Sequence, residues 1–254
     1  MMLKHNYWFF KNALPPEQCE DIIKKGEARI AELKNDGFSS SATTFGENYK
    51  GAVEDGKPLN DKTIRDVEGK TYVRDSEVCW FNDEDMKQII YDYVHKANKN
   101  AGWNYDWDFG EDIQFTKYGL NQFYGWHFDG SSDHHGVYKR YIPGVTKVKL
   151  KKNGDIPTEY VYANRYGSKL NQIGLTRKLS VTINLSKPGD YEGGNLKFDY
   201  GHHNKDIKQF YECKEIRPQG SIIVFPSYMW HQVTPVTSGN RYSLVMWCLG
   251  RPFK

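Results

Sequence analysis

The sequence predicts a mainly β protein with a jelly-roll core and helices on its N-terminal side. Two amphipathic helical stretches lie within residues 1–110, whereas after Asp112 the chain reads as about eight short strands divided by turn residues. Aromatic residues form 15% of the chain, which suits a β-rich fold with an aromatic-lined pocket. An antiparallel set of this size closes as a double-sheet jelly roll, the cupin-like double-stranded β-helix.

The length of the chain predicts a single domain. A chain of 254 residues can bury one substantial core, so we expect 1–254 to fold as one unit. Residues 1–110 would support the core, and 111–250 would form it, with an insertion at 130–176. No pattern in the sequence indicates a particular oligomeric state.

Net charge bears on the possible partners, and the cysteine content bears on the cellular compartment. Lys and Arg total 35 against 32 Asp and Glu, so net charge predicts neither a nucleic-acid nor a membrane partner. The N-terminus has no long apolar run, and we expect a soluble, cytoplasmic protein. No CxxC spacing is present, which predicts a reducing compartment and no disulfide framework. The four cysteines are Cys19, Cys79, Cys213 and Cys248.

The N-terminal third is expected to be scaffold. Tyr7–Phe10 reads as a strand, and Pro15-Pro16-Glu17 opens a helix that ends at 35–37. Residues 37–70 read as a long loop with short strands at most, either a plain linker or a flap over a site. Residues 71–81 read as a strand. Asn82 would cap a second helix, whose buried face would contain Met86, Ile89, Ile90, Tyr93, Val94 and Ala97.

The insertion at 130–176 contains a predicted hairpin. Residues 145–152 and 158–163 flank Asn153-Gly154, a strong turn signal. The first strand is rich in lysine, which indicates either a solvated edge strand or a lid that attracts an acidic partner. The histidine pairs 134–135 and 202–203 read as surface residues.

The C-terminal strands are expected at 177–185, 196–200, 221–225, 230–234 and 241–247, and residues 209–216 lead into the last three. In the last stretch, residues 230–234 and 241–247 read as neighbouring antiparallel strands joined by a turn at 237–240. His231 and Arg241 would then lie on adjacent strands, and both need partners because burying either alone is costly.

Two histidines and one carboxylate form a candidate metal site. His127 and Asp129 stand two residues apart, so in a strand they point to one side. With His231 they make a set that leaves three metal positions open, as in non-haem Fe(II) oxygenases. An H-x-D motif alone is a weak signal, and the later His and Arg strengthen it.

Arg241 is the candidate anchor for a dicarboxylate. In the predicted hairpin it lies about five residues along the ladder from His231, or roughly 15 Å. The five-carbon 2-oxoglutarate could chelate a metal at one end and reach a guanidinium at the other. Arg suits this role because its planar fork binds a carboxylate bidentately.

Together these residues resemble the Fe(II)- and 2-oxoglutarate-dependent dioxygenases, within them the prolyl-4-hydroxylase-like branch. The similarity covers roughly residues 70 to 250. The motifs that carry it are His127, Asp129, His231, Arg241 and Ser243, with Tyr118-x3-Gln122-x-Tyr124-x2-His127, Arg177 to Leu185, Glu192-Gly193-Gly194 and Gly220 to Pro226.

The resemblance implies roles for further residues. Ser243 and Tyr118 would join Arg241 at the far carboxylate, and Asn184 would help to hold the co-substrate. Tyr124 and Trp247 would face the prime substrate. For the two tyrosines the alternative is an aromatic residue packed in the barrel wall.

Arg74 is a further candidate substrate contact. It stands in an Arg74-x-Ser76 phrase similar to one that precedes the second helix in this family. The alternative is a charged residue that points outward from a strand.

The activity implied is hydroxylation of an unactivated C–H bond with Fe(II), 2-oxoglutarate and O2, giving succinate and CO2, with ascorbate as a reductant. The substrate would be a prolyl or other residue of a peptide or protein. Alternatives are a small-molecule hydroxylase, a nucleic-acid dealkylase, for which charge gives little support, and a non-catalytic metal-binding jelly roll that acts as an interaction protein.

Overall fold

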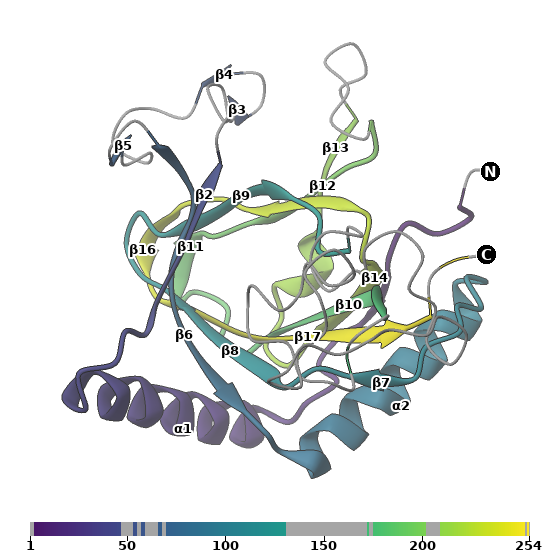
Figure 1. The fold of residues 1–254 in the computed structure, drawn as a ribbon, viewed down its shortest axis with the longest axis horizontal. Coiled ribbons are helices and arrows are strands. Elements are labelled where there is room, and N and C mark those ends of the chain that lie inside the picture. The colour runs from purple at the N-terminus through teal and green to yellow at the C-terminus, as the bar shows by residue number, and fades with distance from the viewer. Residues whose placement is uncertain are drawn as a thin grey trace, which may run out of the picture.

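The structure is a computed structural model in which two helices precede most of the strands (Figure 1). It describes residues 3–46, 53–54, 57–58, 66–67, 70–130, 172, 175–201, 209–251 and 253. The elements are β1 (Trp8–Phe10), α1 (Pro16–Asn35), β2 (Ser41–Gly46), β3 (Val53–Glu54), β4 (Lys57–Pro58), β5 (Asp66–Val67), β6 (Lys70–Phe81), α2 (Glu84–Asn100), β7 (Phe109–Gly110), β8 (Ile113–Tyr118), β9 (Phe123–His127), β10 (Thr176–Asn184), β11 (Tyr191–Gly193), β12 (Leu196–Asp199), β13 (Phe210–Glu212), the 3-10 helix η3 (Lys214–Ile216), β14 (Ile222–Pro226), β15 (Trp230–Val233), β16 (Val236–Gly239) and β17 (Arg241–Gly250).

The strands form the jelly roll that the sequence predicts. One continuous antiparallel path runs β1-β14-β10-β17-β8-β6-β9-β15-β12-β13. The path curls so that β8, β10 and β17 face β9 and β12 (Figure 1). β6 joins the two halves because Arg74 and Asp75, near its middle, pair with β9 and its last part, Glu77–Phe81, pairs with β8.

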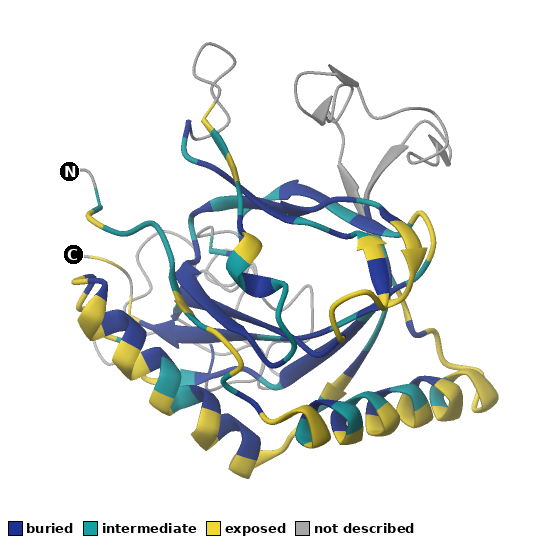
Figure 2. Cartoon of the chain, turned by 180° about the vertical axis from the view of Figure 1, so that it is seen from behind, coloured by how far each residue is buried: buried dark blue, intermediate teal, exposed yellow. Residues whose placement is uncertain are grey.

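Both helices cover the outer face of the half that contains β8, β10 and β17, with their exposed sides turned away from it (Figures 1 and 2). Their buried residues share one hydrophobic cluster with the sheet. Gly26 of α1 lies under the Phe115 ring, where an added Cβ would come within 2.4 Å of ring carbons. Close approach of α1 to the sheet therefore depends on the missing side chain at this position.

A polar link also ties α1 to the sheet. Tyr242 on β17 donates a 2.6 Å hydrogen bond to Glu27, and Lys117 on β8 lies 2.9 Å from the same carboxylate. Burial alone would raise the pKa of Glu27, but these two partners more than offset it, and the pKa is lowered. Tyr242, which makes this link, stands between Arg241 and Ser243 in the sequence of β17.

Some predicted details of the scaffold are wrong. The cap of α2 is Asp83, which accepts a hydrogen bond from the Met86 amide, and the predicted Asn82 lies one residue too early. Ile89 is 36% exposed, because the buried face of α2 is narrower than its apolar pattern suggests. Residues 41–46, by contrast, form a short strand, β2, beside β6, which the predicted loop with short strands allows.

The predicted hairpin between His231 and Arg241 is also wrong. β15 has β9 on one edge and β12 on the other, so no edge remains for β17. The chain instead crosses through β16, which pairs with β11, and β17 then runs between β10 and β8. His231 and Arg241 therefore lie in opposite halves of the jelly roll, and the ladder distance predicted between them does not apply.

Several predictions fall on residues outside the described ranges: most of the proposed 37–70 flap, the basic hairpin at 145–163, and the histidine pairs 134–135 and 202–203. All four cysteines are described, and each is buried with a free thiol. Neither of the two described helices has the length and apolar character that crossing a membrane requires.

Candidate active site

His127, Asp129 and His231 meet inside the jelly roll. One possible donor atom from each residue lies within 4.8 Å of the others. β9 and β15 pair with His127 opposite His231, which places the two imidazole centroids 4.1 Å apart. The Asp129 carboxylate completes the group, with Oδ1 3.6 Å from Nε2 of His127 and Oδ2 3.5 Å from Nε2 of His231. The predicted metal set is therefore brought together.

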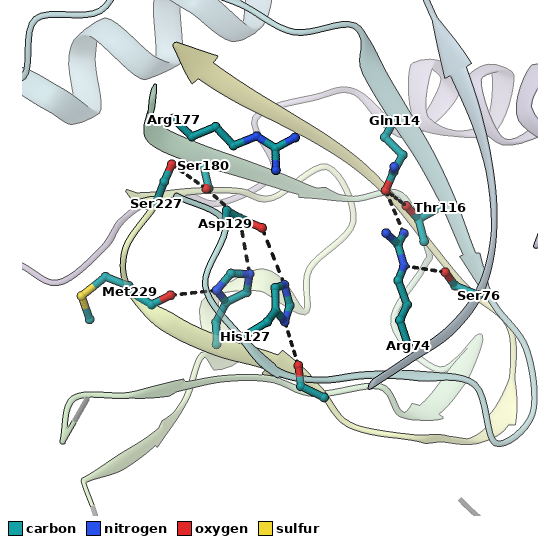
Figure 3. A network of polar contacts seen from close by, with 12 residues as sticks. Arg74, Ser76, Gln114, Thr116, His127, Asp129, Arg177, Ser180, Ser227 and Met229 are labelled. Atoms are coloured by element: carbon teal, nitrogen blue, oxygen red, sulfur yellow. Dashed lines mark hydrogen bonds and ion pairs between the residues drawn. The ribbon is translucent and has the colours of Figure 1, made fainter. Parts of the chain in front are cut away.

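Backbone carbonyls orient both imidazoles (Figure 3). Nδ1 of His127 lies 2.7 Å from the Gly125 carbonyl oxygen, and Nδ1 of His231 lies 2.9 Å from that of Met229. A carbonyl oxygen can only accept, so each Nδ1 carries a hydrogen, and in a neutral imidazole Nε2 then keeps the lone pair. Both lone pairs are available on the side of Asp129, the arrangement that a metal ligand requires.

Asp129 reaches the group by a different route from the one predicted. β9 ends at His127, so strand alternation does not place the carboxylate. Its amide instead donates to the Ser227 carbonyl at 2.8 Å, which fixes the chain just beyond the strand. Burial alone would raise the pKa of Asp129, but the two histidines, Arg177 and a hydrogen bond from Ser180 lower it strongly, which favours the carboxylate.

The imidazole of His127 is kept neutral. Burial lowers its pKa well below the usual value, and the nearby His231 lowers it further, while Asp129 opposes both effects. A neutral imidazole is the form that binds metal, so the electrostatics agree with the geometry.

Arg241 lines the same cavity from the other half of the jelly roll. It is 1% exposed, yet only Nη1 has a described partner, the Ser243 hydroxyl at 3.2 Å. Its Nε and Nη2 have no hydrogen-bond partner among the residues described. Tyr118 lies opposite in the β8–β17 register, with the guanidinium 5.4 Å from its ring centroid. A buried guanidinium with two unpaired nitrogens can donate two hydrogen bonds to an acidic group that enters the cavity.

Tyr124 stacks on His127, and Arg74 stacks on Tyr124. The Tyr124 ring lies 3.4 Å from that of His127, and the Arg74 guanidinium lies 4.7 Å from the Tyr124 centroid. Arg74 also donates to Ser76 at 2.9 Å and to Gln114 at 2.8 Å (Figure 3). Burial raises the pKa of Tyr124 to about 12, so its hydroxyl stays protonated near neutral pH.

Trp247 forms another wall of the cavity. Its ring lies 3.9 Å from the Arg177 guanidinium, which in turn binds Glu111 through two hydrogen bonds of 2.7 and 2.8 Å. The indole Nε1 is buried without a partner in the described part of the chain. Trp80, which is 47% exposed, contacts the same ring at 6.0 Å between centroids and links it to the surface.

Nine of the ten predicted site residues line this cavity: Arg74, Tyr118, Tyr124, His127, Asp129, His231, Arg241, Ser243 and Trp247. The tenth, Asn184, does not. It is fully buried, and its amide bonds to the backbone of Ser186 and Arg217, which closes the chain after β10. These bonds occupy the groups that the predicted co-substrate contact would need.

Sequence reasoning missed three contributors: the Arg177–Glu111 pair, and the serines 180 and 227 beside Asp129. One signal was available. Ser180 and Thr182 alternate with apolar residues in β10, and polar residues at period two in a buried strand indicate an inward face that is not simple core.

Comparison with known proteins agrees with this geometry. The family model for the 2OG-Fe(II) oxygenase superfamily matches residues 113–249, more than half of the chain. A PKHD-type hydroxylase of Prochlorococcus marinus is 39% identical over 103 residues, which is 39% of this chain and 43% of that protein. A PKHD-type hydroxylase of Hyphomonas neptunium is 38% identical over 73 residues, 29% of each chain. The matches thus span less than half of these relatives.

Solved structures share the fold over nearly the whole chain. A viral collagen prolyl hydroxylase from Paramecium bursaria chlorella virus 1, in complex with 2OG, covers 97% of both chains at TM-score 0.52 and 15% identity. A Pseudomonas putida prolyl-4-hydroxylase covers 96% of this chain and 93% of that one at TM-score 0.51 and 15% identity. The jelly-roll fold and the match to the family model together establish that the chain belongs to the 2OG-Fe(II) oxygenase superfamily.

Proposed function

We propose that the chain is an Fe(II)- and 2-oxoglutarate-dependent hydroxylase, with His127, Asp129 and His231 as the metal ligands. Two imidazole nitrogens and one carboxylate oxygen are the donor set of non-haem Fe(II) oxygenases, and these residues offer it within 4.8 Å. The neutral His127 and the ionised Asp129 are in the protonation states that binding requires. The residues therefore fit the metal that the family uses.

The proposal rests on the buried guanidinium of Arg241, two nitrogens of which have no hydrogen-bond partner among the described residues. A structural metal site would need no buried guanidinium, whereas a dicarboxylate co-substrate needs a cation for its far end. The two unpaired nitrogens of Arg241 can receive that carboxylate bidentately, with the Ser243 hydroxyl and the Tyr118 ring beside the guanidinium. When bound, Fe(II), 2-oxoglutarate and O2 supply the oxidising power that inserts oxygen into an unactivated C–H bond, with succinate and CO2 as co-products and ascorbate as an auxiliary reductant.

The remaining wall residues would bind the prime substrate. The protonated Tyr124 hydroxyl, the Arg74 guanidinium and the unpaired Trp247 indole are all donors, and they suit a substrate rich in carbonyl groups. A peptide presents such groups at regular intervals. We therefore favour a prolyl or other residue of a peptide, in line with the prolyl-4-hydroxylase-like motifs and the hydroxylase relatives.

The experiment is an anaerobic titration of the apo-protein with Fe(II) and 2-oxoglutarate, followed by visible absorption. We expect a charge-transfer band that requires both ligands and weakens in Asp129→Ala and in Arg241→Ala. Absence of the band in folded protein that has bound metal would refute the oxygenase and favour a metal-binding jelly roll. If the band forms, peptides with and without proline are compared for 2-oxoglutarate-dependent gain of one oxygen by mass spectrometry. Hydroxylation of the proline-free peptides alone would refute the prolyl substrate.

A further inference from the structure

Two buried serines form a hydrogen-bonded chain that ends on Asp129. Ser180 on β10 donates to Oδ2 of Asp129 at 2.7 Å, and the Ser180 and Ser227 hydroxyl oxygens lie 2.9 Å apart (Figure 3). Both serines are fully buried, and Asp129 is 4% exposed. The contacts therefore form without competition from bulk water. Charge-assisted hydrogen bonds are stronger in such a buried environment than in water.

The direction of this chain follows from the number of hydrogens. A serine hydroxyl has one hydrogen to donate. Ser180 gives its hydrogen to the carboxylate, so the second contact requires Ser227 to donate to the Ser180 oxygen. Two donors thus act in line on one carboxylate oxygen, and the outer hydroxyl strengthens the bond made by the inner one.

The main chain fixes the same arrangement. The amides of Asp129 and Gly130 both donate to the Ser227 carbonyl at 2.8 Å. A Cβ at Gly130 would lie 2.7 Å from the Ser227 Cβ and 2.7 Å from the Arg177 carbonyl oxygen, so no side chain fits there. Because β9 has already ended, this contact with Ser227 holds Asp129 in place of a strand ladder.

The two carboxylate oxygens consequently differ. Each oxygen faces one histidine, Oδ1 at 3.6 Å from Nε2 of His127 and Oδ2 at 3.5 Å from Nε2 of His231. Only Oδ2 also accepts a hydrogen bond, from Ser180, whereas Oδ1 accepts none from the described residues and keeps its lone pairs for a metal. On the proposed metal role of Asp129, we infer that Ser180, supported by Ser227, is a positioning residue that makes Asp129 a monodentate ligand through Oδ1. Three protein donors then leave three metal positions for the co-substrate and O2, whereas a bidentate carboxylate would take one of them.

The test uses Mn(II) as a redox-inert probe in wild type, Ser180→Ala and Ser180→Thr. Metal-bound waters are counted by electron–nuclear spectroscopy in 17O water, and Mn(II) and 2-oxoglutarate affinities are measured by calorimetry. We expect Ser180→Ala to hold one water fewer than wild type and to bind 2-oxoglutarate about 10- to 100-fold more weakly, the range typical of lost outer-shell contacts. Ser180→Thr restores the hydroxyl and should recover both values.

Two further variants complete the design. Ser227→Ala removes only the outer donor, so a smaller loss of 2-oxoglutarate affinity is expected. Ser221→Ala is the matched control, because Ser221 is equally buried but its hydroxyl accepts from the Asn12 amide, away from the cavity.

Three outcomes would overturn the inference. An unchanged water count in Ser180→Ala does so, as does an equal loss of metal and co-substrate affinity, which would indicate a merely structural role. Either result leaves the proposed function standing provided that wild type binds both ligands. Failure of wild-type protein to bind Mn(II) and 2-oxoglutarate would refute the proposed function together with the inference.

Discussion

Arg241→Met is expected to separate stability from ligand binding. The side chain is 1% exposed and keeps two nitrogens without a described partner, so the free protein carries a buried charge that is only partly satisfied. Methionine is unbranched and fills a similar space. Removing unsatisfied buried donors typically stabilises a protein by about 1–3 kcal/mol, and we expect this gain in the unliganded variant.

Ligand binding should change in the opposite direction. Without Arg241 the far carboxylate of 2-oxoglutarate is buried without a cation, which costs about 3–5 kcal/mol. At about 1.4 kcal/mol per tenfold, affinity falls by roughly 2 to 3.5 orders of magnitude. Wild type at about 100 times its Kd should gain about 2.7 kcal/mol from the ligand, and the variant should gain almost nothing.

The assay is chemical unfolding of Mn(II)-loaded protein with and without 2-oxoglutarate, with Arg241→Lys as a variant that keeps the charge but loses the planar fork. We expect that variant to bind with intermediate affinity. A less stable unliganded Arg241→Met, or one that 2-oxoglutarate stabilises as much as wild type, would refute the assignment of Arg241 as an anchor waiting for a carboxylate.

Three further predictions concern the scaffold. Arg177→Met should cost about 3–5 kcal/mol of unfolding free energy in urea, because the buried Glu111 carboxylate loses this cation and its two hydrogen bonds. Adding Glu111→Gln should recover part of the loss, and additive losses would contradict the pairing. Gly26→Ala should lower the unfolding free energy. Overpacking against Phe115 costs about 1–3 kcal/mol, whereas alanine in place of glycine in a helix interior contributes only about 1 kcal/mol; a stabilised variant would contradict the contact. The pKa of Glu27 is lowered in the folded protein, so its partners stabilise the fold above the unfolded pKa, and this contribution is lost as pH falls through the folded pKa. The unfolding free energy of Glu27→Gln should therefore fall less than that of wild type between neutral and acid pH. Parallel pH profiles of the unfolding free energy in the two proteins would contradict this prediction.

The sequence was enough to predict the jelly roll and most of the site, although two of the reasons were wrong. The H-x-D spacing identifies His127 and Asp129, but a bend held by Ser227 places the carboxylate and strand alternation does not. Turn residues between His231 and Arg241 favour a hairpin, and local chemistry cannot reveal that both edges of β15 are already occupied.

Other features depend on contacts that no spacing encodes. Asn184 looks like a polar group facing the site, yet its amide is used by backbone far along the chain at Arg217. The alternation of Ser180 and Thr182 in β10 indicates an inward polar face, but it does not reveal the contacts of Ser180, because these come from two other segments of the chain. Polar groups of this kind acquire meaning only when the tertiary fold supplies their partners.

The proposed function requires one cavity to hold a metal at one end and to bind a carboxylate through Arg241 at the other. Crystals grown anaerobically with Mn(II) and 2-oxoglutarate, and measured at the manganese absorption edge, test this most directly. We expect an anomalous peak bound by Nε2 of His127, Oδ1 of Asp129 and Nε2 of His231, with the far carboxylate of 2-oxoglutarate on Nε and Nη2 of Arg241. A peak at another position, or a co-substrate that leaves Arg241 unpaired, would contradict it.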